Sequence, residues 1–434
     1  MEELKDFSEF EAFVARFTNY ERVVNLSYDK KTLGPRRMEA LCAALGNPEA
    51  AVPTLHIAGT KGKGSTCLML EALLSAGGFR VGTYTSPHVE HLRERIRIHR
   101  APIAEEQLVA RLNEALPYLT HCQDHVPEDF PTFFEIMTAL ALTCLRADEV
   151  DWGIFEVGLG GRLDATNVVL PAWTAITSIG LEHTQQLGDR LESIAREKAG
   201  IIKKGIPLVL GEVPPEAERE ILAVAETHEA RVVQPGRSMV TSAGPRKIQI
   251  DTPTVHRAFP AGAVRGPALR SDLALALAIF EGVLSDAGRT LSTTELERGI
   301  EQIELPARLE WIDSDPPILL DGAHTTESIR ALRHALDEIE FPRPRTLVFS
   351  LASDKRVDSI LTELRAMDFA EIIWTRPDAL RSIPPRELAA QFGRGEVNEE
   401  PTEALEQARR IGNPIVITGS FYLAGALRKH VVRS

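Results

Sequence analysis

The most constraining feature of this sequence is the stretch 56–65, which reads HIAGTKGKGS. The apolar run 52–58 predicts a short buried strand, and the apolar segment 66–74 predicts a helix. Three glycines within six residues lie between the two elements. Glycine lets the backbone approach an anion closely, and the free N–H groups at a helix start favour phosphate. The order of strand, glycine loop and helix therefore predicts a phosphate-binding loop.

The polar side chains of this loop fit the same use. We expect Lys63 to reach the β and γ phosphates of a nucleotide and Ser65 to add a hydroxyl group. The spacing differs from that of the common P-loop, because Gly64 separates the lysine from the hydroxyl. The alternative is a tight turn that binds nothing.

Length and composition limit the class of protein. A chain of 434 residues has room for two or three domains. Its net charge of −13 argues against nonspecific binding to nucleic acid, which needs a basic face. There is no run of 18 apolar residues and no apolar signal region in the acidic segment 1–11, so we expect no membrane span. Four cysteines without metal-type spacing fit a reducing cytoplasm, where we expect the protein to act.

Strands and helices alternate along the chain, which predicts parallel sheets with crossover connections. We expect an α/β protein with a P-loop ATPase-like domain at 1–306 and a smaller Rossmann-like domain at 307–434. Residues 211–270 are richer in Pro and Gly and predict a small β-rich excursion. Thr132 and Glu135 predict a capping box at the start of a helix that runs to 147. Further strands are expected at 79–84, 152–157, 173–179, 207–210, 318–320, 346–350, 372–375 and 415–418, and further helices at 7–17, 35–45, 191–202, 271–284, 291–303, 326–339, 357–366, 385–392 and 422–430.

The segment 89–99 is rich in arginine. Arg93, Arg95 and Arg97 are compatible with a solvated strand edge or with a surface loop that meets an acidic substrate. The residues by themselves favour the solvated strand edge.

Polar residues follow several of the predicted strands. Glu156, Asp164 and His183 lie at or just past strand ends, where parallel sheets bind ligands. A carboxylate, an imidazole and a hydroxyl can hold a hard cation such as Mg²⁺. Each residue taken singly is a weak signal, and Lys198 is most simply a helix lysine that faces solvent.

Nine motifs occur in an order that resembles the folylpolyglutamate synthase and dihydrofolate synthase family of the Mur ligase superfamily. They are HIAGTKGKGS (56–65), YTSPH (84–88), ERIRI (94–98), PTFFE (131–135), EVGLGGRLDATN (156–167), TSIGLEHT (177–184), REKAGIIK (196–203), DGAH (321–324) and ITGS (417–420). The resemblance covers nearly the whole chain. It implies a ligase that uses ATP to activate a pteridine carboxylate as an acyl phosphate, which the amine of L-glutamate then attacks.

The resemblance also implies roles for individual residues. The ATP contacts would be Gly59, Thr60, Lys61, Gly62, Lys63, Gly64, Ser65, Asp272, Arg308, Asp321 and His324. The magnesium ligands would be Ser86, Glu156, His183 and Lys198, the last as a carbamate, and Lys63, His183 and Lys198 would act in catalysis. The acceptor contacts would be Thr132, Phe134, Arg162, Leu163, Asp164 and Ala165, and the segment 86–98 resembles a mobile loop over that pocket. Two Mg²⁺ ions and a monovalent cation are the implied cofactors, and the implied form is a monomer.

Three positions depart from the family pattern. Lys61 replaces an asparagine and adds positive charge near the phosphates, Thr325 stands where an asparagine follows the histidine of the DGAH motif, and Asp272 aligns with an asparagine that touches the nucleotide. An aspartate at this position is expected not to donate a hydrogen bond as an amide does. The departures at Asp272 and Thr325 leave open a nucleotide-binding protein that has lost ligase activity. The same chemistry on a different carboxylate also stays open, because the sequence does not fix the acceptor pocket.

Overall fold

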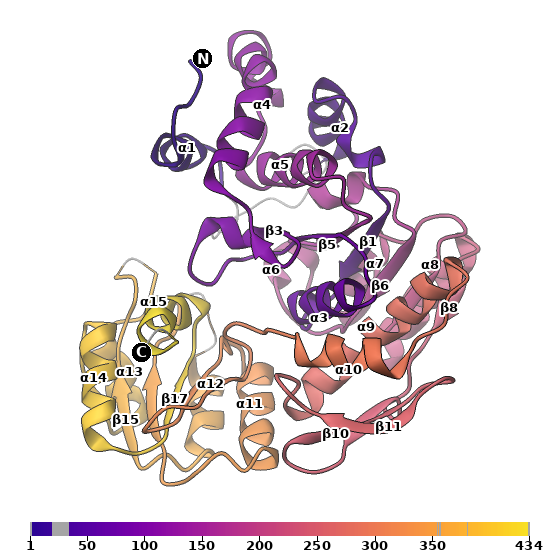
Figure 1. Cartoon of the computed structure of the whole chain (residues 1–434). Helices are drawn as coiled ribbons and strands as arrows, with labels where there is room; N and C mark the ends of the chain where they lie inside the picture. The colour runs from indigo at the N-terminus through magenta and orange to yellow at the C-terminus, as the bar shows by residue number, and fades with distance from the viewer. Residues whose placement is uncertain (1, 20–33, 354, 356, 380, 433–434) are drawn as a thin grey trace.

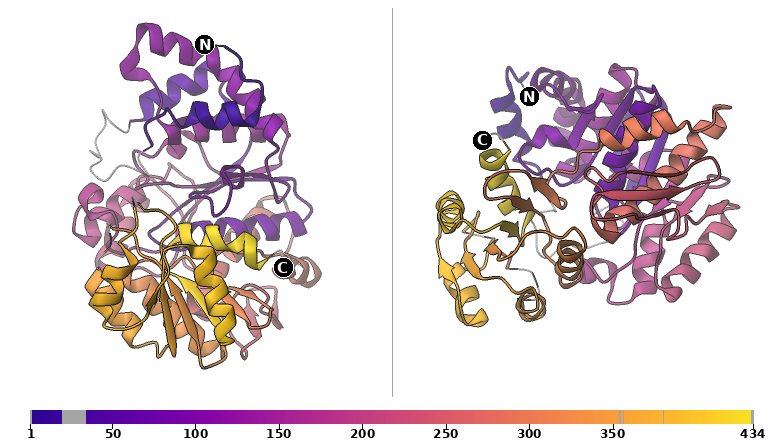
Figure 2. Two further views of the ribbon diagram at one scale, coloured as in Figure 1. Left: turned by 90° about the vertical axis from the view of Figure 1, so that its left-hand side faces the viewer. Right: turned by 60° about the horizontal axis from the view of Figure 1, so that its bottom comes forward.

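The computed structural model describes residues 2–19, 34–353, 355, 357–379 and 381–432. In this part of the chain the strands form three sheets of eight, three and six strands. Figures 1 and 2 show the six-stranded C-terminal sheet at one end of the molecule and helices α1, α2, α4 and α5 at the other. The predicted α/β class, with a larger N-terminal and a smaller C-terminal α/β part, is confirmed.

The eight-stranded sheet carries the glycine loop at its centre. Its order is β4-β3-β2-β5-β1-β6-β7-β8. β1 (Thr54–Ala58) pairs in parallel with both β5 (Trp152–Glu156) and β6 (Trp173–Ile176), so three strand ends meet at one edge. All of β1 is buried, as expected for a strand with helices on both faces. The other strands are β2 (Val81–Tyr84), β3 (Ile96–Ile98), β4 (Ala101–Pro102), β7 (Leu208–Leu210) and β8 (Val232–Val233).

Two groups of helices cover this sheet (Figure 1). α1 (Phe7–Val14), α2 (Pro35–Ala44), α4 (Glu105–His125) and α5 (Phe133–Ala147) share one apolar core on the first face. α3 (Lys63–Ala76), α9 (Gly266–Asp286) and α10 (Thr293–Glu301) pack on the other face, and that core continues into the C-terminal part. α6 (Thr184–Leu187), α7 (Leu191–Ala199) and α8 (Pro215–Thr227) complete the N-terminal part.

The expected β-rich excursion exists, but it is shorter than 211–270. It is an antiparallel sheet of β9 (Val240–Ser242), β10 (Lys247–Asp251) and β11 (His256–Pro260). Helix α8 occupies the beginning of the same region, with prolines at its start. Proline is well tolerated in the first turn of a helix, so the proline content concealed this helix.

The C-terminal sheet has the order β12-β13-β17-β14-β15-β16 and is parallel except for β12. Its strands are β12 (Glu310–Ile312), β13 (Ile318–Leu320), β14 (Thr346–Phe349), β15 (Glu371–Trp374), β16 (Glu396–Val397) and β17 (Ile415–Thr418). Its helices are α11 (Thr326–Glu338), α12 (Val357–Arg365), α13 (Pro385–Phe392), α14 (Pro401–Ile411) and α15 (Phe421–Val431).

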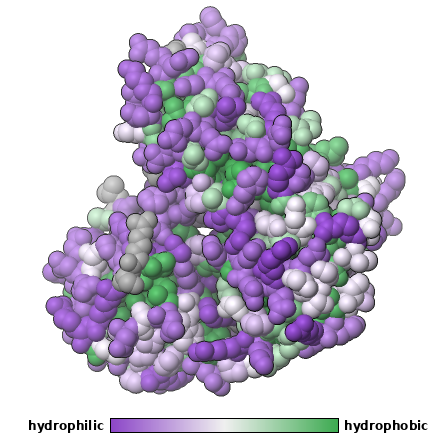
Figure 3. All heavy atoms as spheres, in the orientation of Figure 1, coloured by the Kyte–Doolittle hydropathy of each residue, from purple (hydrophilic) through white to green (hydrophobic). Residues whose placement is uncertain are grey.

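Within the described residues, none of the helices combines the length and the apolar character needed to cross a bilayer. Figure 3 shows hydrophilic residues over most of one face, with an indentation where the N-terminal and C-terminal parts meet.

Candidate functional site

The glycine loop links the end of β1 to the first turn of α3. Gly62 is the N-cap of α3 in the left-handed region, with φ of 87°, and Lys63 is the first helical residue. A Cβ atom on Gly59 would lie 1.9 Å from Thr177 Oγ1, and one on Gly62 would lie 2.1 Å from Asp272 Oδ1. Only glycine fits both positions. The helix begins at Lys63 rather than at the expected residue 66, so the lysine lies on the helix N-terminus itself.

Two lysines share one backbone acceptor beneath this loop. Lys63 Nζ donates to the carbonyl oxygen of Gly59 at 3.1 Å, and Lys198 Nζ donates to the same oxygen at 2.9 Å. Lys198 is only 5% exposed, so the alternative of a solvated helix lysine is wrong. Burial, and then the charge of Lys63, lowers the pKa of Lys198 to about 7. A large share of this side chain is therefore a neutral amine at neutral pH.

Glu156 faces the phosphate loop from the end of β5. Its Oε2 accepts a hydrogen bond from the Ser86 backbone N–H at 2.9 Å. A Cβ atom on Gly64 would lie 2.6 Å from Arg308 Nη2 and 3.2 Å from Glu156 Oε2, so both side chains reach the first turn of α3. Burial raises the pKa of Glu156, while the cations Lys63 and Arg308 oppose the rise. The structure thus brings together Ser86, Glu156, Lys63 and Arg308.

His183 lies at the start of α6 with a positive φ of 52°. Burial lowers the pKa of its ring to about 4, so the imidazole is neutral at pH 7, the form that binds a metal ion. Within the described ranges, no three His, Cys, Asp or Glu side chains are grouped so that they could hold a metal ion. The predicted metal site therefore depends on the Ser86 hydroxyl and a modified Lys198 in addition to Glu156 and His183.

Lys61 has a partner that the sequence analysis did not identify. Its ammonium group forms a 2.5 Å ion pair with Glu182, and its backbone N–H donates to Ser178 Oγ at 2.9 Å. Burial would raise the pKa of Glu182, but Lys61 and neighbouring cations outweigh it and bring the value to about 2. The positive charge that Lys61 adds to the loop is therefore balanced. The signal for Glu182 was its place in the TSIGLEHT motif, immediately before His183.

Asp272 projects from α9 toward the same loop. Burial raises its pKa to about 8, against the opposing effects of Arg308 and of a hydrogen bond with Ser65. At neutral pH the group is therefore largely a neutral acid, which can donate one O–H hydrogen bond. The expectation that this residue cannot donate applies only to its ionised form.

The other predicted nucleotide contacts lie in and after the linker between the sheets. Arg308 stacks over the Phe421 ring at 5.3 Å. Asp321 accepts hydrogen bonds from the backbone N–H groups of Leu309 and Ala323, each at 2.8 Å, and burial raises its pKa to about 6. His324 Nδ1 lies 2.7 Å from the Gly322 carbonyl oxygen.

The departure at Thr325 has a local structural explanation. Thr325 is the N-cap of α11, and its side chain accepts a hydrogen bond from the Ser328 backbone N–H. Threonine and asparagine are both good N-caps, so the exchange preserves the start of the helix.

Arg162, Leu163 and Asp164 lie in the loop after β5, and the Phe134 ring packs against Gly158 of the same loop. Thr132 and Glu135 form the expected capping box, with hydrogen bonds of 3.2 and 2.7 Å. The Phe134 ring lies 5.8 Å from Tyr84, and Leu163 is buried. Arg162 forms a 2.8 Å ion pair with Glu197. Ala165 begins the short 3-10 turn Ala165–Val168 that closes this loop.

Asp164 organises that loop from inside. Its carboxylate accepts hydrogen bonds from the backbone N–H groups of Gly158, Leu159 and Thr166, and from the Thr166 hydroxyl. Thr166 Oγ1 in turn lies 2.8 Å from Nε2 of His56, which is fully buried in β1. This link between the acceptor-side loop and the strand that carries the phosphate loop has no signal in the sequence, because it forms only when distant segments pack together. A contact between Asp164 and substrate stays a prediction.

The segment 89–99 was expected to form a solvated strand edge, and this expectation is wrong for the exposure of its arginine side chains. The strand exists as β3, but Arg95 is only 2% exposed and donates to His88 Nδ1 at 3.0 Å. Arg97 forms a 3.0 Å ion pair with Glu71 of α3. The family expectation of a mobile loop over 86–98 also needs correction at its end, because β3 pairs with β2 and β4 in the sheet.

Comparisons with known proteins agree with this geometry. Residues 307–421 match the family described as Mur ligase, glutamate ligase domain. The chain is 34% identical to the dihydrofolate synthase/folylpolyglutamate synthase of Bacillus subtilis, over 96% of this chain and 100% of that protein. It is 32% identical to the folylpolyglutamate synthase of Lacticaseibacillus casei, over 92% of this chain and 94% of that protein.

A solved structure shares the whole fold. The Mycobacterium tuberculosis folylpolyglutamate synthase complexed with ADP superposes with a TM-score of 0.87 at 29% identity, over 99% of this chain and 98% of that one. Sequence, fold and the phosphate loop together lead to one assignment. The chain belongs to the folylpolyglutamate synthase and dihydrofolate synthase family of ATP-dependent Mur-type ligases.

Proposed function

We propose that this chain joins L-glutamate to the carboxylate of a pteridine compound, dihydropteroate or a reduced folate, and converts ATP to ADP and phosphate. The observation that carries the proposal is the first turn of α3, where Lys63, Arg308 and Glu156 converge on a loop that only glycine can form. We propose that the chain acts on these small molecules as a monomer.

The phosphate loop supports the nucleotide part of this proposal. The N-terminus of α3 offers free backbone N–H groups, and Lys63 and Arg308 place two cations beside it. Phosphoryl transfer depends mainly on positioning and on neutralising charge, which these groups supply. Residues 59–65, with Asp272, Asp321 and His324, are the proposed nucleotide contacts.

A magnesium site fits the residues beside this loop. Glu156 offers a buried carboxylate, and His183 is neutral because burial lowers the pKa of its ring to about 4. We propose that Ser86, Glu156 and His183 hold one Mg²⁺, and that Lys198 serves a second as a carbamate. The Lys198 amine suits carbamate formation because burial and Lys63 lower its pKa to about 7. Mg²⁺ held there would supply positive charge that offsets the charge of the phosphates.

The reaction has two steps. A carboxylate oxygen of the acceptor attacks the γ-phosphorus atom, which gives an acyl phosphate and ADP. The neutral amine of glutamate then attacks the acyl carbon, phosphate leaves with the bridging oxygen, and the amine proton passes to solvent. Lys63 and Arg308 hold the transferred group, and Thr132, Phe134, Arg162, Leu163, Asp164 and Ala165 are the proposed residues around the acceptor.

A substrate panel tests the proposal. The purified chain is incubated with ATP, Mg²⁺ and glutamate, and with dihydropteroate, tetrahydrofolate or unrelated carboxylic acids, while ADP release is measured. We expect ADP release that needs both glutamate and a pteridine acid. Turnover with another acid would change the acceptor assignment alone. Nucleotide binding without turnover on any acid would favour a protein that has lost ligase activity.

A further inference from the structure

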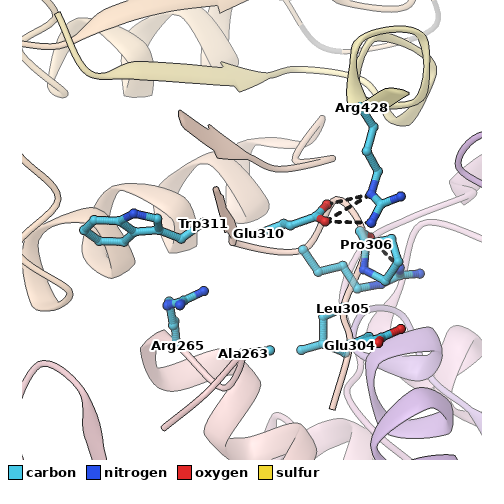
Figure 4. A pocket seen from close by; sticks show the side chains of 9 residues that line it. Ala263, Arg265, Glu304, Leu305, Pro306, Glu310, Trp311 and Arg428 are labelled. Carbon is cyan, nitrogen blue, oxygen red and sulfur yellow. Dashed lines mark hydrogen bonds and ion pairs between the residues drawn. The ribbon is translucent and has the colours of Figure 1, made fainter. Parts of the chain in front are cut away.

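One cluster of ion pairs joins the N-terminal part of the chain to the C-terminal part. Its residues lie far apart in the sequence. Arg428 on α15 contacts Glu90 with Nη1 at 2.5 Å and Glu310 with Nη2 at 2.8 Å. Figure 4 shows Arg428 reaching from α15 to Glu310 beside the linker at Pro306. The side chains of Glu90, Glu310 and Arg428 are 10%, 18% and 22% exposed, so water screens these pairs much less than ordinary surface pairs.

The backbone makes a second contact at the same place. Gly425 lies one turn before Arg428 on α15, and a Cβ atom there would lie 1.9 Å from the Val89 carbonyl oxygen. Any side chain at this position would push the segment around Val89 away from the helix. Val89 also packs against the apolar core of the C-terminal sheet.

The segment that carries Glu90 is internally tied. The Glu94 carboxylate accepts hydrogen bonds from the backbone N–H groups of Val89, Glu90 and His91, at 2.8, 3.0 and 2.8 Å. The Thr85 N–H donates to the Arg95 carbonyl oxygen at 2.9 Å, which closes the loop at its base. A displacement of Glu90 is therefore transmitted to the start of the segment.

That start is part of the proposed site. The Ser86 N–H donates to Glu156 at 2.9 Å, and Glu156 approaches the first turn of α3. We propose that Arg428 is a positioning residue, which holds the segment 85–95, and with it Ser86, against Glu156 by binding Glu90 and Glu310 together. This role rests on the proposed function only where it is tested by turnover.

Two variants break the contact by different means. Glu90→Gln removes the charge of the loop partner and leaves the pair of Arg428 with Glu310 in place. Gly425→Ala keeps every charge, favours the helix, and forces the loop outward. For both we expect glutamate-dependent turnover to fall roughly tenfold, as for a misplaced positioning group. The turnover of Arg428→Lys should fall less, because lysine keeps a positive charge that can still bind one carboxylate.

Hydrogen exchange supplies a readout independent of activity. In both variants the backbone amides of 85–95 should exchange about tenfold faster, while α14 keeps its protection. Arg330→Met is the matched control, because it removes an arginine that pairs with Glu363 between two helices of the same C-terminal part. The control should change neither exchange in 85–95 nor turnover.

A double variant tests whether Glu90 acts through Arg428. Glu90→Gln with Arg428→Met should lose no more turnover than Arg428→Met alone, because the contact is already broken. Additive losses of turnover in the double variant would overturn the proposal. Hydrogen exchange in 85–95 that stays unchanged in Glu90→Gln and Gly425→Ala would also overturn it, even if turnover is slower. If the native chain shows no glutamate-dependent turnover, the proposed function fails, and the exchange measurement still decides whether this contact holds the segment.

Discussion

At the scale of single residues, the pairing of two lysines on one carbonyl oxygen has the clearest chemical consequence. Lys63 and Lys198 both donate to Gly59, and two ammonium groups so close together repel each other. The conflict is relieved if Lys198 is neutral, as burial and Lys63 favour by lowering its pKa to about 7. A neutral buried amine can capture CO₂, and the carbamate would offer oxygen to a hard cation.

We predict that Lys198→Ala is nearly inactive, with a loss of roughly a hundredfold or more in turnover, and that short carboxylic acids partly restore activity. The added acid would supply the oxygen atoms that the carbamate supplies in the native chain. Turnover of the variant is measured with and without acetate. Full activity without acetate, or a structure with two metal ions beside a free amine, would rule out the carbamate.

Removing Lys63 tests the phosphate loop separately. We expect Lys63→Ala to lose roughly a hundredfold or more in turnover at saturating ATP, by analogy with the loss of one electrostatic donor. Lys204→Ala is the control, since Lys204 is a largely exposed lysine in a 3.6 Å surface pair with Glu229. Near-normal turnover of Lys63→Ala would mean that the loop is not used as proposed.

His56 links pH to stability. Burial, with a smaller effect of Lys203, lowers its pKa from 6.5 to about 3. Between these values the unfolded chain binds a proton that the folded chain does not. The contribution of His56 to the free energy of unfolding is therefore fully present above pH 6.5. It is lost as the pH falls below that value, by up to about 1.4 kcal/mol per pH unit.

When the pH is lowered from 7.5 to 5.5, the free energy of unfolding should therefore decrease less for His56→Gln than for the native chain. The free energy of unfolding in urea, measured at both values, checks this expectation. His256→Gln is the control, because the side chain of His256 is 71% exposed. Equal pH dependence in all three proteins would contradict it.

The sequence indicated the candidate site residues that belong to a recognisable motif, such as Lys63 and Glu156. It did not indicate residues whose role comes from packing. The ion pair of Glu182 with Lys61 exists only in the folded chain, and Asp272 becomes a neutral acid only because α9 buries it against the loop. The exposure of Arg95 was mispredicted for the same reason, since its environment is built by distant segments.

At the scale of elements, the start of α3 is the feature on which the proposed nucleotide binding depends. Gly62 and Gly78 both have φ of 87°, but a Cβ atom on Gly62 would lie 2.1 Å from Asp272 Oδ1, whereas Gly78 has open space around it. A substitution of Gly78 therefore introduces backbone strain alone, whereas a substitution of Gly62 introduces the same strain together with a steric clash.

Gly62→Ala should weaken ADP binding at least about tenfold, because both strain and the clash move the first turn of α3. Gly78→Ala should bind ADP normally and lose about 1–2 kcal/mol of stability from strain alone. Calorimetric titration with ADP and urea unfolding check the pair. Equal ADP affinity in the two variants would contradict the role given to the first turn.

Several elements were predictable from the sequence, and two helices that carry proline were not. The strands β1 and β5 and the capping box of α5 agree with the sequence. The 21-residue helix α4 was missed, and it contains Pro117, a residue that normally interrupts helices. α14 was also missed, and it begins at Pro401, where proline is tolerated.

At the scale of the whole molecule, the phosphate loop belongs to the N-terminal sheet, whereas Arg308, Asp321 and His324 lie in the linker and the C-terminal part. The apolar core is continuous from α3 and α9 into β13 and α11. The division at residues 306 and 307 stays a prediction from the restart of βα alternation. Arg428 also links the two parts, because it pairs with Glu90 of the N-terminal part and Glu310 of the C-terminal part, and its proposed role is to hold the segment 85–95.

The measurement that tests the central claim most directly follows one oxygen atom. The pteridine acid is labelled with ¹⁸O in its carboxylate and incubated with the chain, ATP, Mg²⁺ and glutamate, and the released phosphate is analysed by mass spectrometry. Attack on the γ-phosphorus followed by amide formation predicts one labelled oxygen in each phosphate released. Unlabelled phosphate accompanying amide product would contradict an acyl-phosphate ligase.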